Sequence, residues 1–415
     1  MSSPSSASPG GPDVRRVALL GSTGSIGRQA IEVLADPRFR VVALAAGSNA
    51  ALLAEQVERL RPAAAALADE AAARDVAERV RDAGTTLLVG EDALVELAVR
   101  DDVDMVVVGT GGVVSLRPII AALDAGKIVA TANKETLVAG GHLVMPRARA
   151  LAADRRATAP ADPLASPLGW LRPIDSEHSA IWQCLVGEDL AAVQRLILTA
   201  SGGPFLDLPI EDFASVTPEM ALRHPTWSMG AKITVDSATL ANKGLEVIEA
   251  HWLYDSAYEA IDVVIHPQSV VHSAVQFVDG SLKAQLGSPD MRLPIQYALT
   301  HPDRRPSPAA PADLLAVARL DFLAPDEARF PALRIARDAG PLGPRATAAL
   351  IAADDVAVAR FLGGSLDFPG IPRLLEAAVA RFGTPMGADP DLDELVALDR
   401  EVRASLASVP APSPA

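Results

Sequence analysis

A glycine-rich loop near the N-terminus constrains the fold of this chain more than any other feature. Gly21, Gly24 and Gly27 follow the apolar run Val17–Leu20 and open a stretch of helical pattern. Glycines let a backbone approach a phosphate closely, and the N–H groups at a helix N-terminus attract the anion. The spacing is G-x-x-G-x-x-G rather than G-x-G-x-x-G, so a tight turn without a ligand is the alternative. In this strand–turn–helix context we predict a dinucleotide site, with contacts from Thr23, Gly24, Ser25 and Ile26.

The region from residue 14 to residue 150 alternates between short β-rich runs and helix-length segments rich in Ala, Glu and Arg. Near-continuous apolar strands between helices indicate a parallel sheet that helices cover on both faces. The expected fold class is therefore α/β, beginning with a doubly wound, Rossmann-like sheet that forms a dinucleotide-binding domain. Strands are predicted at Val17–Leu20, Val41–Leu44, Leu87–Val89, Met105–Val108 and Ile128–Ala130.

The remaining chain is expected to form a central α/β catalytic domain and a C-terminal helical bundle. The catalytic, metal- and substrate-binding domain spans residues 151–300, a proline-rich linker spans residues 301–324, and the bundle spans residues 325–408. Residues 152–166 show no period and predict an exposed loop, whereas Asp279-Gly280 predicts a hairpin turn. Helices are predicted at Ser179–Val186, Ser237–Tyr254, Asp326–Ala339, Arg345–Leu362, Pro372–Phe382 and Leu392–Leu406, and further strands at Leu196–Leu198 and Ile261–Ile265.

The amino-acid composition limits the classes of molecule that this protein is expected to bind. The 415 residues include 37 Lys and Arg against 52 Asp and Glu, a net charge of −15, which argues against nucleic acid and anionic membranes. The first 13 residues are rich in Ser, Pro and Gly and predict a disordered tail rather than a secretory signal. No apolar stretch has the length of a membrane span, so we expect a cytoplasmic protein. The single cysteine, Cys184, excludes an internal disulfide and predicts a buried thiol.

The segment after the second predicted strand bears on the choice of cofactor. An NAD site usually has Asp or Glu about 20 residues after the glycines, to bind the ribose 2′-hydroxyl. Gly47, Ser48 and Asn49 stand there instead, which favours NADP, because an acid would repel its 2′-phosphate. A plain loop is the alternative. A second candidate loop follows the strand at Ile128–Ala130, where Asn133 and Glu135 would face the cofactor and Lys134 the substrate.

Two further motifs carry carboxylates. If Asp175 and Glu177 lie in an extended segment, both side chains point the same way, and a divalent cation would relieve their repulsion. All-oxygen ligands suit Mg²⁺ or Mn²⁺. On a helix, Asn242, Lys243 and Glu246 share one face, which could hold a phosphate and complete the metal site. The alternatives are a solvated edge for the first motif and a surface helix with a Lys–Glu pair for the second.

Residues 201–230 are bracketed by glycine and proline and contain no strong strand. Ser201 begins the segment, and His224, Trp227 and Met229 lie near its end. This pattern predicts a mobile lid with an apolar tip, and a packed structural loop is the alternative.

Taken together, these motifs resemble the 1-deoxy-D-xylulose 5-phosphate reductoisomerase family. The resemblance implies that a metal-bound keto sugar phosphate rearranges to a branched aldehyde, which NADPH reduces to 2-C-methyl-D-erythritol 4-phosphate in the non-mevalonate isoprenoid pathway. It also implies Mg²⁺, Mn²⁺ or Co²⁺ as the metal and a homodimer as the assembly. The matching motifs are the glycine loop, Asn133–Glu135, Asp175–His178, Ser201–Phe205, His224–Gly230, Ser237–Glu246 and Ile265–Ser269, in that order.

The resemblance also implies individual roles. The metal ligands are Asp175, Glu177 and Glu246, which are catalytic together with Lys134, and Gly230 approaches the cofactor. Phosphate contacts fall on Ser201, Ser237, Asn242 and Lys243 with His224 nearby, substrate oxygens on Ser176 and Lys134, and the closing side chains are Trp227 and Met229.

The sequence departs from the family pattern at three places. Residues 152–166 are longer than expected, and Ser48 stands where many members have a basic residue. Ile351-Ala352-Ala353-Asp354-Asp355 replaces what usually reads N-A-A-N-E, and we expect an effect on packing or on the dimer only. Two other functions stay open: an NADP-dependent dehydrogenase without rearrangement, and a non-catalytic NADP-sensing module.

Overall fold

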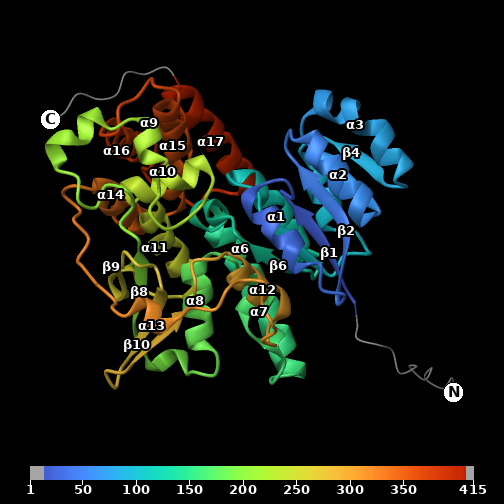
Figure 1. The fold of residues 1–415 in the computed structure, drawn as a ribbon, viewed down its shortest axis with the longest axis horizontal. Helices are drawn as coiled ribbons and strands as arrows, with labels where there is room; N and C mark the ends of the chain where they lie inside the picture. Colours follow the sequence, from blue (N-terminus) through green and yellow to red (C-terminus); the bar gives the residue numbers. More distant parts are fainter. Residues whose placement is uncertain (1–13, 408–415) are drawn as a thin grey trace.

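The computed structural model describes residues 14–407, so the tail predicted at residues 1–13 lies outside the described residues. Figure 1 shows the chain as an N-terminal α/β unit in blue and cyan, a central region in green and yellow, and a helical C-terminal region in orange and red. Among residues 14–407, no helix combines the length and the apolar character that a membrane crossing requires.

The N-terminal region is built around a seven-stranded parallel sheet with the order β4-β3-β2-β1-β5-β6-β7. The chain moves outward from β1 in one direction and then returns to start again beside it, so β1 and β5 are neighbours and form the switch point of the sheet. The doubly wound, Rossmann-like prediction is confirmed. The strands are β1 (Arg15–Leu20), β2 (Phe39–Ala46), β3 (Ala64–Leu67), β4 (Thr86–Val89), β5 (Met105–Val108), β6 (Ile128–Thr131) and β7 (Leu171–Pro173).

Helices connect these strands and cover the sheet. They are α1 (Ser25–Val33), α2 (Ala50–Leu60), α3 (Glu70–Asp82), α4 (Asp92–Ala98), α5 (Leu116–Asp124), α6 (Lys134–Thr158) and α7 (Pro167–Trp170). The prediction of an exposed loop at residues 152–166 is wrong for the first half of this segment, because α6 continues through the helix-forming Ala and Arg residues to Thr158.

A second sheet of four strands has the order β11-β10-β8-β9. The predicted hairpin is confirmed: β10 and β11 pair antiparallel, and Gly280 between them has a φ of +84°. The strands are β8 (Val193–Ala200), β9 (Ile261–Ile265), β10 (Val271–Phe277) and β11 (Leu282–Leu286). The helices of this region are α8 (Ser176–Leu185), α9 (Pro218–Ala221), α10 (Ala231–Thr239), α11 (Ala241–Tyr254), α12 (Arg292–Thr300) and α13 (Leu314–Val317).

The C-terminal region is helical, as predicted. Its helices are α14 (Pro331–Ala339), α15 (Pro344–Leu362), α16 (Gly370–Phe382) and α17 (Leu392–Leu406).

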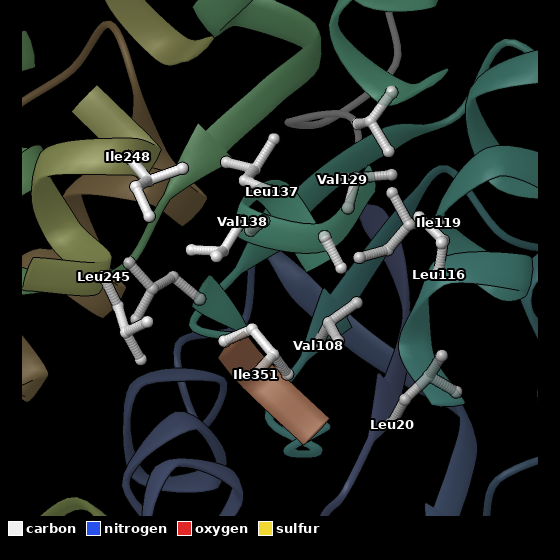
Figure 2. Close-up of a cluster of buried hydrophobic side chains, with 14 of the residues drawn as sticks. Leu20, Val108, Leu116, Ile119, Val129, Leu137, Val138, Leu245, Ile248 and Ile351 are labelled. Atoms are coloured by element: carbon white, nitrogen blue, oxygen red, sulfur yellow. The ribbon is translucent and has the colours of Figure 1, made fainter. Parts of the chain in front are cut away.

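One hydrophobic core connects the three regions. Leu20 and Val108 of the first sheet, Leu137 of α6, Ile248 of α11 and Ile351 of α15 are all fully buried. Figure 2 shows these side chains in one cluster, with α6 between the parallel sheet and the later helices. Because α6 packs against the sheet, α11 and α15, it holds the loops at the end of the sheet in a fixed relation to the central region.

Candidate active site

Four loops leave the carboxyl edge of the parallel sheet next to one another. They follow β1, β5, β6 and β7, which are consecutive in the sheet order. The first two carry glycines, the third carries Asn133, Lys134 and Glu135, and the fourth carries Asp175. Ligands of open α/β sheets bind outside the carboxyl ends of the strands at the switch point, so this edge is the expected site.

The glycine loop after β1 is as tight as its sequence predicts. Gly21 has a φ of +87°, and a Cβ there would lie 2.7 Å from the carbonyl carbon of Gly109. A Cβ on Gly27 would lie 2.2 Å from the Gly21 carbonyl oxygen. Only glycine fits at either position, so the loop brings the N-terminus of α1 close against the β5 loop. The first turn of α1, at Ser25 and Ile26, lines a cleft of about 1090 Å³.

Sequence reasoning missed the loop from Gly109 to Gly112, which forms another wall of this cleft. The same signal, a glycine cluster directly after an apolar strand, could have found it. Asn133 holds this loop in place, because its Nδ2 donates to the carbonyl oxygens of Thr110 and Gly112 at 2.7 and 2.8 Å. Its Oδ1 accepts from the backbone N–H of Thr136 and caps α6. The side chain of Asn133 is therefore used within the protein rather than turned to the cleft.

The residues predicted to bind the 2′-phosphate of NADP lie on the exposed surface of the molecule. Gly47, Ser48 and Asn49 are exposed at the end of β2 and lie outside the walls of the cleft. Asn49 also caps α2, because its Oδ1 accepts from the backbone N–H of Leu52 at 3.2 Å. Its Nδ2 and the hydroxyl of Ser48 are the side-chain donors that this segment offers to a phosphate.

A buried cluster of carboxylates and ammonium groups lies beside the cleft. Lys134 Nζ is 2.8 Å from Asp175 Oδ2 and 3.2 Å from Glu246 Oε1. Lys243 Nζ is 2.5 Å from Glu246 Oε2 and 3.1 Å from Glu177 Oε1. The structure thus brings together the three predicted carboxylates and both lysines, with Glu246, which is fully buried, between the two ammonium groups.

The local conformation of the Asp175 motif differs from the predicted extended segment. α8 begins at Ser176, three residues before the predicted start, and Asp175 caps it by accepting from the backbone N–H of Glu177 at 3.2 Å. Glu177 therefore projects from the first helical turn, where its Oε2 accepts from the Ser176 hydroxyl at 2.5 Å. The carboxylates converge because of the cap and the helix that follows it, and not because of strand alternation.

Asp175, His178 and Glu246 each offer one potential metal-ligand atom, and these three atoms lie within 4.8 Å of one another. His178 is fully buried, and its Nε2 is 3.2 Å from Glu249 Oε2. Glu177 is not in this group, because its carboxylate is turned toward Lys243.

The charges in this cluster shift one another's protonation. Burial alone would raise the pKa of Asp175, but Lys134 and His178 outweigh burial and hold the pKa below its usual range. Burial and the nearby Glu246 raise the pKa of Glu177 to about 7. Burial lowers and the surrounding carboxylates raise the pKa of Lys134, and the carboxylates dominate. The two lysines thus compensate carboxylates that would otherwise be crowded without a cation.

The third group of side chains consists of hydroxyls around an imidazole. His224 Nε2 lies 2.9 Å from Ser201 Oγ and 3.1 Å from Ser237 Oγ. His224 Nδ1 accepts from the backbone N–H groups of Thr226 and Trp227, so the proton of the neutral ring is on Nε2. Burial lowers the pKa of His224, which keeps the ring in this neutral form. The His224 N–H therefore faces the two serine oxygens, and the Ser201 and Ser237 hydroxyls, which line the small cavity, can turn their own protons toward a ligand.

The helix predicted from Ser237 to Tyr254 is broken at one residue. Leu240 has a φ of +60° and separates α10 from α11. Ser237 consequently faces His224, whereas Asn242 faces the carboxylates, where its Nδ2 donates to Glu246 Oε1 at 2.6 Å and its Oδ1 accepts from Lys134 at 2.5 Å. Asn242, Lys243 and Glu246 share one face of α11, as predicted, whereas Ser237 belongs to α10.

The predicted lid has two unlike parts. Residues 205–221 contain the buried Phe205, Phe213 and Ala221, and the rings of Phe205 and Phe213 both pack against Phe368, which follows α15. Residues 222–230 form no helix or strand and are mostly exposed, and the ring centroid of Trp227 is 6.0 Å from that of His272. The features expected of a mobile tip are therefore confined to the second part, which we call the lid loop.

A smaller cavity of about 140 Å³ connects these groups. It shares six wall residues with the large cleft, including Ser25 of α1, Lys134 of α6 and Gly230 at the end of the lid loop. The small cavity therefore opens into the cleft at the N-terminus of α1. The predicted residues in its wall are Ser25, Ile26, Lys134, Asp175, Ser176, Glu177, Ser201, Trp227, Met229, Gly230, Ser237, Asn242, Lys243 and Glu246, joined by the unpredicted Ile233 and Met291.

The fold and the site define an α/β oxidoreductase in which a dinucleotide cleft opens onto a buried carboxylate cluster. Three family profiles together cover most of the chain: 1-deoxy-D-xylulose 5-phosphate reductoisomerase matches residues 17–141, its C-terminal domain residues 171–254, and a second C-terminal domain residues 286–405. The chain belongs to the 1-deoxy-D-xylulose 5-phosphate reductoisomerase family, so the resemblance found in the sequence is confirmed.

Relatives and solved structures agree with this assignment. The chain is 48% identical to the reductoisomerase of Pelotomaculum thermopropionicum over 94% of this chain and 97% of that protein. It is 49% identical to that of Moorella thermoacetica over 94% and 96% of the two chains. The Zymomonas mobilis enzyme in complex with NADPH matches with a TM-score of 0.83 and 38% identity over 95% and 98% of the chains. A reductoisomerase in complex with NADPH, fosmidomycin and magnesium matches with a TM-score of 0.85 and 37% identity over 94% and 97%.

Proposed function

We propose that this chain converts 1-deoxy-D-xylulose 5-phosphate to 2-C-methyl-D-erythritol 4-phosphate, using NADPH and a divalent metal ion, in the non-mevalonate isoprenoid pathway. The observation that carries the proposal is the common wall of the two cavities. A dinucleotide in the large cleft would pass the N-terminus of α1, where Ser25 and Ile26 also face the small cavity with the carboxylates. The hydride donor and the rearranging carbon skeleton would therefore meet at this opening.

The carboxylate cluster fits a hard divalent cation. The ammonium group of Lys134 lies between Asp175 and Glu246, and that of Lys243 lies between Glu246 and Glu177. Three carboxylates that already gather around cationic groups are a donor set suited to Mg²⁺ or Mn²⁺. We propose Asp175, Glu177 and Glu246 as the ligands, with His178 orienting Asp175 from behind. A bound ion would supply Lewis acidity toward the adjacent carbonyl and hydroxyl oxygens of the substrate.

The remaining polar side chains would bind and orient the sugar phosphate. We propose that the Ser201 and Ser237 hydroxyls donate to the phosphate, because both line the small cavity and His224 Nε2, 2.9 and 3.1 Å from their oxygens, holds them in place. Ser176 and Lys134 would bind the reacting oxygens, and Lys134 carries a proton that a developing negative charge attracts. Asn242 and Lys243 are assigned to the substrate between the metal and the phosphate, because both also line the small cavity.

The lid loop and the glycine loops would complete the site. We propose that Trp227 and Met229 cover the bound substrate and exclude water from it. Thr23, Gly24, Ser25, Ile26 and Glu135 would contact the dinucleotide together with Gly230, and Asn133 would act by holding the Gly109–Gly112 loop. Gly47, Ser48 and Asn49 would bind the 2′-phosphate and so favour NADPH. The N-terminal sheet, the central region and the helical bundle then act as cofactor, catalytic and supporting units.

We also propose a homodimer in the cytoplasm. β11 is an edge strand of the second sheet, and edge strands present unpaired backbone groups to a partner. Leu282 and Leu286 of β11 are 63% and 39% exposed, which favours a second copy as the cover of this edge. Analytical ultracentrifugation of the protein and of a Leu282→Lys variant tests it, and a monomeric parent protein would refute it. The cytoplasmic assignment is in keeping with a chain whose one cysteine cannot form an internal disulfide.

One assay tests the proposed function. Purified protein with Mg²⁺, NADPH and 1-deoxy-D-xylulose 5-phosphate should oxidise NADPH and yield the branched product, identified by NMR. Oxidation of NADPH with an unbranched product would indicate the dehydrogenase alternative. Binding of NADPH without binding of Mg²⁺ in calorimetry would indicate the non-catalytic sensing module.

A further inference from the structure

A second cluster of charged side chains meets at the start of α10, away from the proposed metal ligands. Lys232 Nζ is 2.6 Å from Asp354 Oδ2 and 2.8 Å from Asp236 Oδ2. Glu135 Oε1 and Asp355 Oδ1 follow at 3.6 and 3.7 Å. The four carboxylates come from three helices, α6, α10 and α15, so one ammonium group connects all three.

Burial makes this lysine difficult to replace. Asp354 and Asp236 are 0% and 1% exposed, and Asp236 Oδ1 and both carboxylate oxygens of Asp354 have no hydrogen-bond partner, so the ion pair with Lys232 is the compensation that Asp354 Oδ2 receives. Buried carboxylates are costly unless a cation compensates them. Burial alone would lower the pKa of Lys232, but Asp236 and Asp354 outweigh burial and raise it well above its usual value. Lys232 is therefore held as a cation in one position.

The position of the cluster relates it to the lid loop and to the cofactor cleft. Gly230, the last residue of the lid loop, caps α10, and Lys232 lies in the first turn of that helix. Glu135, Lys232 and Asp236 line the large cleft, and Glu135 directly follows Lys134 of the catalytic cluster. The other end of the lid loop is held at the Ser201–His224–Ser237 group, which would rearrange when a phosphate binds, and by the Thr226 hydroxyl, which donates to the Pro267 carbonyl oxygen at 3.4 Å.

We propose that Lys232 is a positioning residue for the reaction. By binding Asp354 of the helical bundle and Glu135 of α6, it fixes the C-terminal end of the lid loop beside the cofactor cleft, so that only the His224 end moves on closure. The inference rests on the proposed function, and it assigns the Asp354-Asp355 pair, where this chain departs from the family motif, a part in lid closure. This differs from our sequence-based expectation that the pair affects packing or the dimer only.

The test uses Asp354→Asn, which keeps the shape and removes one charge. The matched control is Asp338→Asn, which makes the same chemical change in an exposed pair with Arg334. Hydrogen exchange of residues 222–232 is measured with NADPH and fosmidomycin, the ligands of a solved relative, together with kcat and KM. We expect Asp354→Asn to lose the ligand-induced protection and to lower kcat/KM roughly ten- to hundredfold, the range that misplaced binding groups cause. Asp338→Asn should behave as the parent protein.

Retention of both the protection and kcat/KM in Asp354→Asn would overturn the proposal. Should that variant not fold, Lys232→Met and Lys232→Arg provide a second comparison, because Met removes the charge and Arg keeps it. Loss in the Met variant with partial recovery in the Arg variant supports a positioning role, and equal behaviour of the two overturns it. Because the exchange measurement needs no turnover, a parent protein that binds both ligands but does not oxidise NADPH would refute the proposed function separately.

Discussion

Replacing Glu246 by Gln tests the proposed metal site most directly, because this carboxylate is the centre of the buried cluster. Its Oε1 lies 3.2 Å from Lys134 Nζ and 2.6 Å from Asn242 Nδ2, and its Oε2 lies 2.5 Å from Lys243 Nζ. Glutamine has nearly the same shape, so the cavity stays filled. The change removes one negative charge and turns one acceptor into a donor that faces an ammonium group or another amide.

The structure sets the expected magnitudes. The cluster joins two ammonium groups to three carboxylates, and the variant would leave two of each. Breaking a buried ion pair costs about 3–5 kcal/mol, and relief of carboxylate repulsion partly offsets this, so we expect a loss of about 3 kcal/mol in the free energy of unfolding. We expect kcat to fall about 10²–10³-fold, which is the loss caused by removing one electrostatic contact to the charge that develops in the transition state.

Urea denaturation measures the free energy of unfolding, steady-state kinetics at saturating NADPH measure kcat, and isothermal titration measures the Mg²⁺ affinity, which Glu246→Gln should also weaken. The matched control is Glu249→Gln, one helical turn further on α11, where the carboxylate is equally buried but contacts His178 instead of a lysine. The control should lose stability and retain most of its Mg²⁺ affinity. Full activity of Glu246→Gln at low Mg²⁺ concentration, or loss of Mg²⁺ binding in Glu249→Gln alone, would show that the three-carboxylate assignment is wrong.

Three further predictions concern the cofactor, the lid loop and the lone thiol. Ser48→Asp should weaken NADPH binding about fivefold, because an exposed carboxylate about 4 Å from the 2′-phosphate costs roughly 1 kcal/mol, and a parent protein that prefers NADH in parallel titrations would contradict the reasoning. Trp227→Ala should lower kcat while the Mg²⁺ affinity stays unchanged, since this side chain borders the cavity but not the carboxylates; unaltered turnover would remove Trp227 from the lid. Cys184, which is 3% exposed and whose pKa burial raises to about 11, should react with a disulfide reagent only after unfolding, and rapid reaction of the native protein would refute its place in the core.

Strands made of branched residues could be predicted from the sequence, and strands without them could not. Met105–Val108 was predicted to the residue, because three consecutive valines favour a buried strand. Ala64–Leu67 escaped notice, since three alanines favour a helix and become a strand here only through pairing with β2 and β4. Leu171–Pro173 pairs with β6 in the first sheet, although it lies beyond residue 150, the predicted end of the N-terminal domain. No local sequence pattern indicates this pairing.

The chemistry of the site was more predictable than its geometry. Asp175, Glu177 and Glu246 come together as their residue types suggested, although Asp175 does so as a helix cap. The hydrogen bonds between Asn133 and the Gly109–Gly112 loop form because β5 and β6 are neighbours in the sheet. The order of strands in a sheet is set by the topology of the whole fold and not by a local sequence pattern. The ion pairs of Lys232 could not be predicted for the same reason, because Asp354 and Asp355 follow it by more than 100 residues in the chain.

Leu240 shows why a continuous helical pattern was misleading at the centre of the site. A left-handed conformation costs a residue with a Cβ roughly 1–2 kcal/mol, so no sequence rule places one at a leucine. Leu240 is only 3% exposed, and full burial of such a side chain stabilises the fold by about 1.5–3 kcal/mol, which outweighs the backbone cost. The break that results turns Ser237 toward His224 and leaves Asn242 and Lys243 with Glu246. Tertiary packing of one apolar side chain thus separates the donor proposed for the phosphate, Ser237, from the proposed metal ligand Glu246 and its partners, within a stretch that the sequence pattern predicts as one continuous helix.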